Sequence, residues 1–290
     1  MQNTQNIEQK IIRTNGIALN VMQAGPKDGK PLILLHGFPE FWYGWRHQID
    51  HLTSKGFRLW IPDQRGYNIS DKPSDIFDYR MDELVMDVIG LINATGQSRA
   101  MIAGHDWGAM VLWWLALKHP DRIERMAILN VPHPRVFQRH LRFNVKQIAK
   151  SWYAGALQVP FLPERLLGLR DGRLFARIVQ FTGLRDTFSA EDLARYREAW
   201  KQPDALRSMI NWYRAYMRYP PSKPVSWRIK PKTLIVWGLR DGALSADMVE
   251  PSYDLCDDGQ RLLLEKATHW VQHDEKERVN QVLGQFFSAE

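Results

Sequence analysis

Residues 104–108 read Gly-His-Asp-Trp-Gly and contain an acidic side chain at a position where it could take part in a reaction. They follow an apolar run at 99–103 and precede a helical pattern at 109–119, so Asp106 is expected where a strand turns sharply into a helix. Flanking glycines let the strand and the helix approach closely. A carboxylate there is a poor nucleophile for acyl transfer, but it can attack an alkyl carbon and form an ester that water later cleaves. The alternative is an ordinary turn with an acid near a helix N-terminus, where negative charge is favourable.

Two further residues stand where a nucleophile at Asp106 would need partners. Asp241 follows an apolar run at 233–237, and His269 follows another at 261–265. A neutral histidine can take a proton from water, while an aspartate fixes its tautomer and stabilises the imidazolium. Each residue alone is also typical of an ordinary turn or loop, but all three at strand ends favour a catalytic triad. The remaining histidines near these motifs are interpreted as structural: His36, His105 and His273.

Residues 36–39, which read His-Gly-Phe-Pro, end the first buried-strand pattern. Attack of water on an ester of Asp106 produces an oxyanion, which two backbone N–H groups must stabilise. Phe38 can supply one from this loop, and Trp107 can supply the other from the start of a helix. A simple turn is the competing interpretation. The sequence leaves open whether the bond before Pro39 is cis.

Strand-like and helix-like segments alternate over the first 130 residues, which is typical of a mostly parallel sheet. Short apolar runs of buried-strand type lie at 31–36, 57–62 and 126–131, and an amphipathic helix is expected at 82–94. We therefore expect an α/β fold with helices flanking a central sheet.

The pattern changes at the Pro-His-Pro stretch beginning at residue 132 and becomes helical and rich in Arg, Trp and Tyr. Strand patterns then resume, and a last helix is expected at 275–287. This arrangement predicts a core formed by residues 1–132 and 225–290, interrupted by a helical cap at 133–224. Such a cap would cover the carboxyl ends of the strands, where open α/β sheets place ligands.

Composition excludes several classes of protein. The 290 residues are 44% hydrophobic, which is enough for a large α/β domain. A lone Cys256 cannot form an intramolecular disulfide, and no Cys/His cluster has the spacing of metal ligands. The polar start lacks the features of a signal peptide, and no segment reaches the ~18 apolar residues that cross a bilayer. A soluble, cytoplasmic protein without metal is expected.

The net charge of +7 is concentrated in the middle of the chain. Residues 133–230 contain 19 Lys and Arg against 7 Asp and Glu. A basic segment can bind nucleic acid or an anionic surface. These residues are scattered through amphipathic patterns without a dense basic run or a glycine-rich phosphate loop, which favours a solvated helical face. No nucleic-acid or membrane partner is expected.

Taken together, these motifs resemble those of the epoxide hydrolases of the α/β-hydrolase superfamily along nearly the whole chain. The chain order of nucleophile, acid and histidine agrees with that superfamily. The matching segments are 36–40, 45–48, 63–67, 104–108, 211–214 and 268–273. Two departures concern Asn68, where the family often has glycine, and residues 156 and 157, which are Ala and Leu where aromatic residues are common.

The resemblance implies that Asp106, Asp241 and His269 form the triad. It also implies that Tyr213, in an Asn-Trp-Tyr-Arg stretch, and Tyr153 bind the epoxide oxygen, because a phenol can stabilise and protonate the alkoxide. The expected reaction turns a small apolar epoxide and water into a vicinal diol through a glycol monoester, without metal or organic cofactor. The resemblance leaves monomer and homodimer open.

Two other functions are compatible with the same motifs. A haloalkane dehalogenase also uses an aspartate followed by tryptophan, but Phe38 stands where that family commonly has an amide to bind halide. Dehalogenases of the fluoroacetate type place arginines beside the nucleophile, and residues 107–110 carry no charge. A hydrolase fold that binds a small ligand without turnover is the remaining alternative.

Overall fold

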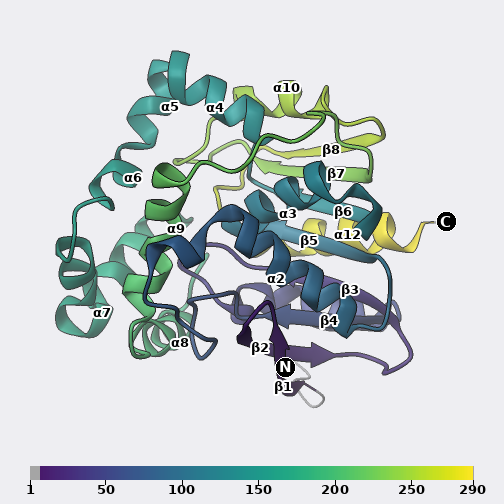
Figure 1. Ribbon diagram of the computed structural model, residues 1–290, viewed down its shortest axis with the longest axis horizontal. Helices are drawn as coiled ribbons and strands as arrows, with labels where there is room; N and C mark the ends of the chain where they lie inside the picture. The colour runs from purple at the N-terminus through teal and green to yellow at the C-terminus, as the bar shows by residue number, and fades with distance from the viewer. Residues whose placement is uncertain (1–6, 290) are drawn as a thin grey trace.

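An eight-stranded sheet runs through the molecule in the order β1-β2-β4-β3-β5-β6-β7-β8 (Figure 1). The computed structural model describes residues 7–289. The strands are β1 Glu8–Thr14, β2 Ile17–Ala24, β3 Lys30–Leu35, β4 Phe57–Pro62, β5 Ala100–His105, β6 Ile123–Leu129, β7 Lys232–Gly238 and β8 Gly259–Leu264. Strand β2 pairs antiparallel with β1 and β4, and every other pair is parallel. The mostly parallel α/β sheet expected from the sequence is confirmed.

Residues 8–24, where β1 and β2 lie, were not among the strands expected from the sequence. Strand β1 is an edge strand that pairs only with β2, and most of its side chains are exposed. Its sequence therefore carries polar residues in place of a continuous apolar run. The polar residues 1–6, in which no signal peptide is expected, lie outside the described residues.

Helices cover both faces of the sheet (Figure 1). On one face Ile33, Ile102 and Ile128 pack with apolar residues of α2 and α3. On the other face Leu32, Ala103 and Leu129 pack with residues of α1 and α12. Because both faces are buried, the central strands are apolar throughout. The helices outside the insertion described next are α1 Arg46–Ser54, α2 Met81–Ala94, α3 Trp107–Lys118, α10 Val249–Tyr253, α11 Val271–Asp274 and α12 Lys276–Ser288, with short 3-10 turns at Trp42–Trp45, Ile76–Tyr79, Pro120–Arg122 and Ala246–Met248.

A helical insertion, residues 134–218, separates β6 from β7 and lies to one side of the sheet in Figure 1. Its helices are α4 Pro134–Phe143, α5 Val145–Lys150, α6 Trp152–Ala156, α7 Leu162–Thr182, α8 Ala190–Trp200 and α9 Ala205–Arg218. Helix α7 is interrupted by non-helical backbone at 169–172. The domain limits at 132 and 224 stay predictions. None of the helices in residues 7–289 combines the length and apolar character needed to cross a membrane.

Candidate active site

Asp106 occupies the turn between β5 and α3 with an unusual backbone, φ 48° and ψ −124°. The turn is tight because its glycines touch backbone atoms. A Cβ on Gly104 would lie 2.7 Å from the Ala109 nitrogen, and one on Gly108 would collide with the Leu35 carbonyl oxygen. Side chains at these two positions would push α3 away from β3 and β5. The carboxylate is thus held beyond the end of β5 by the packing of strand against helix.

The structure brings Asp241 and His269 to the same edge of the sheet as Asp106. Asp241 follows β7 and His269 follows β8, and these strands run parallel to β5. The Nδ1 atom of His269 lies 2.7 Å from Asp241 Oδ2, and its Nε2 atom lies 3.4 Å from Asp106 Oδ2. Asp241 Oδ1 accepts N–H groups of Ala243 at 2.7 Å and Leu244 at 2.8 Å. The imidazole therefore bridges two carboxylates, one of which is fixed by the backbone.

Charge among Asp106, Asp241 and His269, called the triad below for brevity, favours ionised side chains. Burial would raise the pKa of Asp106, but its contact with His269 and the positive charge of that ring outweigh burial and lower it. Burial opposes a charged His269, yet the negative charge of Asp241 and the contact with Asp106 raise the pKa of His269 to about 10. The resting site thus holds a carboxylate at Asp106 beside an imidazolium.

The backbone N–H of Phe38 donates a hydrogen bond to Asp106 Oδ1 at 2.6 Å. The Phe38–Pro39 bond is cis, which answers the question that the sequence leaves open. Trp107 is the first residue of α3, so its N–H belongs to the first turn, where backbone donors have no partner within the helix. Both residues expected to stabilise an oxyanion therefore adjoin the Asp106 carboxylate.

Tyr153 on α6 and Tyr213 on α9 bring their rings together, with centroids 6.0 Å apart. The ring of Tyr213 also lies 4.9 Å from that of Trp107 and 5.1 Å from that of Phe38. Burial, followed by the nearby negative charge of Asp106, raises the pKa of the Tyr153 phenol. Burial and Tyr153 raise the pKa of Tyr213 as well. Both phenols therefore hold their protons at neutral pH and can act as donors.

Apolar residues form the wall around Tyr213. Leu157 and Ile210 pack in one cluster with it, beside Phe38 and Trp107. Leu157 is one of the three residues that depart from the family pattern, so this departure bears on the shape of the wall. A wall of this kind suits an apolar ligand with few polar groups.

Comparison with known proteins identifies the family of this chain. The family described as alpha/beta hydrolase fold matches residues 30–276. The AB hydrolase superfamily protein YfhM of Bacillus subtilis strain 168 is 40% identical over 277 residues, covering 96% of each chain. Epoxide hydrolase 2 of Caenorhabditis elegans is 34% identical over 291 residues, covering 98% of this chain and 81% of the relative. The chain belongs to the epoxide hydrolases of the α/β-hydrolase superfamily.

A solved structure supports the same family assignment. The crystal structure of Bacillus megaterium epoxide hydrolase in complex with an inhibitor superposes with a TM-score of 0.89 at 28% identity, covering 97% of this chain and 100% of that one. The resemblance expected from the motifs is therefore confirmed.

Asn130 is a residue of this hydrolase site that the sequence pattern does not single out. It follows β6 with φ 52°, a left-handed backbone that asparagine adopts more readily than most residues. Its Nδ2 donates to Asp241 Oδ2 at 2.7 Å, and its Oδ1 accepts the Gly238 N–H at 2.9 Å. Asn130 thus ties the triad acid to the end of β7. The only available signal was a polar residue within the apolar run at 126–131.

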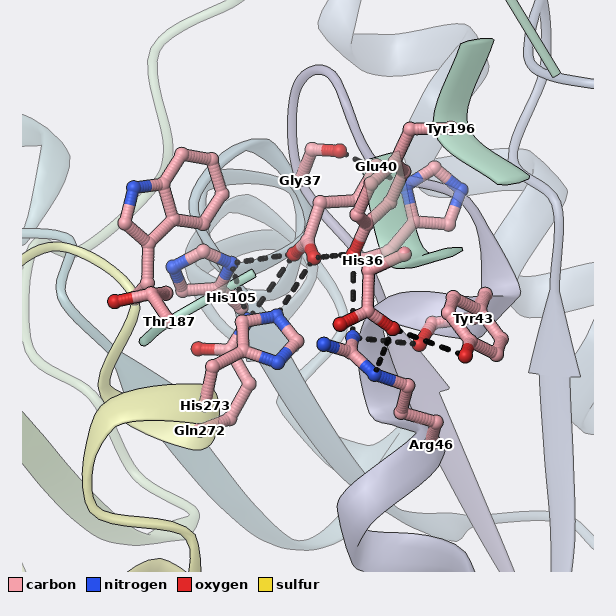
Figure 2. A network of polar contacts seen from close by, with 12 residues as sticks. His36, Gly37, Glu40, Tyr43, Arg46, His105, Thr187, Tyr196, Gln272 and His273 are labelled. Carbon is pink, nitrogen blue, oxygen red and sulfur yellow. Dashed lines mark hydrogen bonds and ion pairs between the residues drawn. The ribbon is translucent and has the colours of Figure 1, made fainter. Parts of the chain in front are cut away.

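The buried carboxylate of Glu40 links the helical insertion to the core (Figure 2). Glu40 is 2% exposed, and its Oε1 accepts the Tyr196 hydroxyl of α8 at 2.6 Å and lies 2.8 Å from His273 Nε2. Its Oε2 lies 3.3 Å from His105 Nδ1. The other ring nitrogen of His105, Nε2, lies 2.8 Å from the carbonyl oxygen of His269. One acid therefore contacts both the insertion and the residue whose ring supports the His269 backbone.

A second polar link lies beside the first. Asp192 at the start of α8 accepts from Arg46 Nε at 3.0 Å and from the Tyr43 hydroxyl at 3.0 Å. His105 and His273 belong to the first link, and His36 supports the Phe38 loop, since its Nε2 accepts the Gln64 N–H at 3.0 Å. The three histidines thus contact structural partners, and the insertion is joined to the core through groups buried behind the triad.

Proposed function

We propose that this protein hydrolyses epoxides to vicinal diols, with Asp106 as the nucleophile. One arrangement carries the proposal. A carboxylate rather than a hydroxyl stands at the turn between β5 and α3, with His269 at 3.4 Å on one side and the phenols of Tyr153 and Tyr213 contributed by the insertion. The relatives named epoxide hydrolases support the same substrate class.

In the first step Asp106 attacks a ring carbon of the epoxide. Oδ1 already accepts the Phe38 N–H, so Oδ2 is the oxygen that bonds to carbon while Oδ1 becomes the ester carbonyl. The carbon–oxygen bond of the epoxide breaks, and its electron pair goes to the epoxide oxygen. A phenol of Tyr153 or Tyr213 gives this oxygen a proton, which avoids a free alkoxide.

Loss of the Asp106 charge prepares His269 for the second step. The imidazolium of the resting site is stabilised by two carboxylates, and esterification removes one of them. The pKa of His269 then falls, and its proton can pass to the tyrosinate left by the first step. Asp241 keeps its charge and its contact with Nδ1, so the neutral ring presents a free Nε2.

In the second step neutral His269 takes a proton from water, and the resulting hydroxide adds to the ester carbonyl. The N–H groups of Phe38 and Trp107 stabilise the oxyanion that forms. Collapse breaks the bond between the ester oxygen and Cγ, and the departing alkoxide takes the proton of the new carboxyl group. The site returns to a carboxylate beside an imidazolium, and one water has been consumed for each diol.

His269→Gln is the variant that tests the two-step scheme. It should still form the ester but hydrolyse it slowly, so the intact protein gains the mass of one epoxide during turnover. The double variant Asp106→Asn/His269→Gln is the matched control and should gain no mass. If His269→Gln stays unmodified with an epoxide that the wild type consumes, the covalent scheme is wrong.

Product analysis separates the remaining alternatives. The purified protein is offered styrene oxide and a bromoalkane in parallel, and diol and bromide are measured. Diol without bromide supports epoxide hydrolysis. Bromide without diol would indicate a haloalkane dehalogenase, and tight binding without either product would indicate a ligand-binding protein.

The helical insertion is, in this proposal, a cap over the carboxyl ends of the strands. It contributes both phenols, and Trp212 and Trp200 donate to the core carbonyls of Arg65 at 2.9 Å and Pro39 at 2.6 Å. We place the limits of the cap at 133 and 224. A cytoplasmic location is proposed with it, because the lone Cys256 is buried as a free thiol.

A further inference from the structure

Exposed apolar side chains are concentrated on the helical insertion. Among residues 7–289, thirteen of the twenty-two large hydrophobic side chains that are exposed fall within 141–181. Phe181 is 91% exposed, Val145 79% and Phe161 78%. Scattered exposed apolar residues are ordinary on a protein surface, but a concentration of this kind indicates a binding surface.

The second half of α7 shows how the exposed residues are arranged. Phe175, Ala176 and Val179 are buried against the rest of the protein. Leu174, Ile178 and Phe181, at spacings of four and three residues, lie on a different face of the same helix and are exposed. This half of α7 therefore has two apolar faces, and only one of them is covered by the described residues.

A second group of exposed apolar residues precedes α7. Phe143 and Val145 lie at the junction of α4 and α5, and Trp152, 73% exposed, opens α6. Figure 1 shows α5, α6 and α7 along one outer margin of the molecule, away from the sheet. We call the exposed face of these three helices, with the α4–α5 junction, the outer face of the insertion.

The segment that contains the outer face is also strongly basic. Residues 133–182 contain nine Lys and Arg against two Asp and Glu. One of the two acids, Glu164, pairs with the buried Arg214 and is not available to the surface. Arg142, Lys146, Arg173 and Arg177 are exposed beside the apolar residues, and within residues 7–289 none of the four makes an ion pair.

We propose that the outer face of the insertion binds the surface of an anionic lipid bilayer. Aromatic and aliphatic side chains interleaved with unpaired basic residues are the combination that binds lipid headgroups and the upper acyl chains. A second copy of the chain fits less well, because it would bring two surfaces of the same charge together. The sequence predicts no membrane partner, and the proposal concerns binding to the surface without a crossing helix.

The test is flotation of the purified protein with vesicles. The wild type should float with vesicles of phosphatidylglycerol and phosphatidylcholine, remain in solution with phosphatidylcholine alone, and be released by high salt. The variant Arg173→Glu/Arg177→Glu should bind at least about 25-fold more weakly, since each basic residue near an anionic surface contributes about fivefold. Phe143→Ser/Phe181→Ser should lose about tenfold or more.

The matched control is Ile11→Ser/Met86→Ser. It removes two exposed apolar side chains that lie outside the insertion, and it should bind as the wild type does. All four substituted apolar side chains are exposed, so circular dichroism should show every variant folded. Failure to float with anionic vesicles would overturn the proposal, as would equal loss in the control. The proposal would also be overturned if light scattering showed that the wild type is a dimer and that Phe143→Ser/Phe181→Ser is a monomer, because the outer face would then bind a second copy.

Discussion

Replacing Asp106 with asparagine imitates the proposed ester in one respect, because it removes the negative charge beside His269 and keeps the size of the side chain. The Nε2 atom of His269 lies 3.4 Å from Asp106 Oδ2. At an effective dielectric constant of about 20 this charge pair contributes roughly 5 kcal/mol, which corresponds to a pKa change of about 3 to 4. The pKa of His269 should therefore fall from about 10 to roughly 6 or 7 in Asp106→Asn.

The assay is an NMR titration of protein labelled in its histidine rings, with His269 assigned by comparison with His269→Gln. Asp63→Asn is the matched control, because Asp63 is a buried carboxylate whose partners are Asn20 and Trp42 instead of His269. The control should leave the titration of His269 unchanged. If the pKa of His269 stays near 10 in Asp106→Asn, loss of the nucleophile's charge does not release the base, and the reasoning that connects the two chemical steps is wrong.

Four further predictions follow from the contacts described above. Tyr213→Phe removes one of the two donors proposed for the epoxide oxygen and should slow ester formation by about 100-fold or more in single-turnover measurements, whereas Tyr216→Phe should not. Asn130→Ala should lower the free energy of unfolding in urea by about 4 kcal/mol, because charged Asp241 loses a hydrogen bond and the buried N–H of Gly238 loses its acceptor. Asn68→Ala, also at a positive φ and bonded to a buried aspartate, should cost less and leave the reaction intact. Glu40→Gln should lower the same free energy by about 3 to 5 kcal/mol, whereas Tyr196→Phe should lower it by about 1 kcal/mol. Equal stability of Glu40→Gln and the wild type would contradict the structural role of this acid. Finally, the pKa of His269 is raised on folding from 6.5 to about 10, so its contacts stabilise the fold fully below about pH 6.5 and lose this effect as the pH rises through about 10. The free energy of unfolding in urea should fall more between neutral and high pH for the wild type than for His269→Gln.

The sequence is most informative where chemistry and local structure coincide. Asp106, Asp241 and His269 each follow an apolar run, and parallel neighbouring strands bring such positions to one edge. The close approach of α3 to β3 and β5 requires glycine at 104 and 108. The parallel part of the sheet and the positions of these three residues at its edge could therefore be predicted.

Contacts between distant segments could not be predicted. Glu40 and Tyr196 are separated by 156 residues, and no local pattern indicates that a glutamate after the first buried strand pairs with a tyrosine of the insertion. Asn130 lies within the apolar run at 126–131, so the sequence pattern includes it in the strand, whereas β6 ends at Leu129. Helical spacing in α7 predicts a buried apolar stripe but does not reveal that Leu174, Ile178 and Phe181 stay exposed. These features depend on which surfaces meet in three dimensions.

The backbone of Asp106 also bears on how this protein could evolve. A φ of 48° with ψ of −124° costs a residue with a side chain on the order of 1 to 3 kcal/mol, and glycine would relieve most of it. Selection for stability alone would therefore favour glycine at this turn, at the expense of the nucleophile proposed above. Because an acid stands at this strained position, additional stability must come from other parts of the chain.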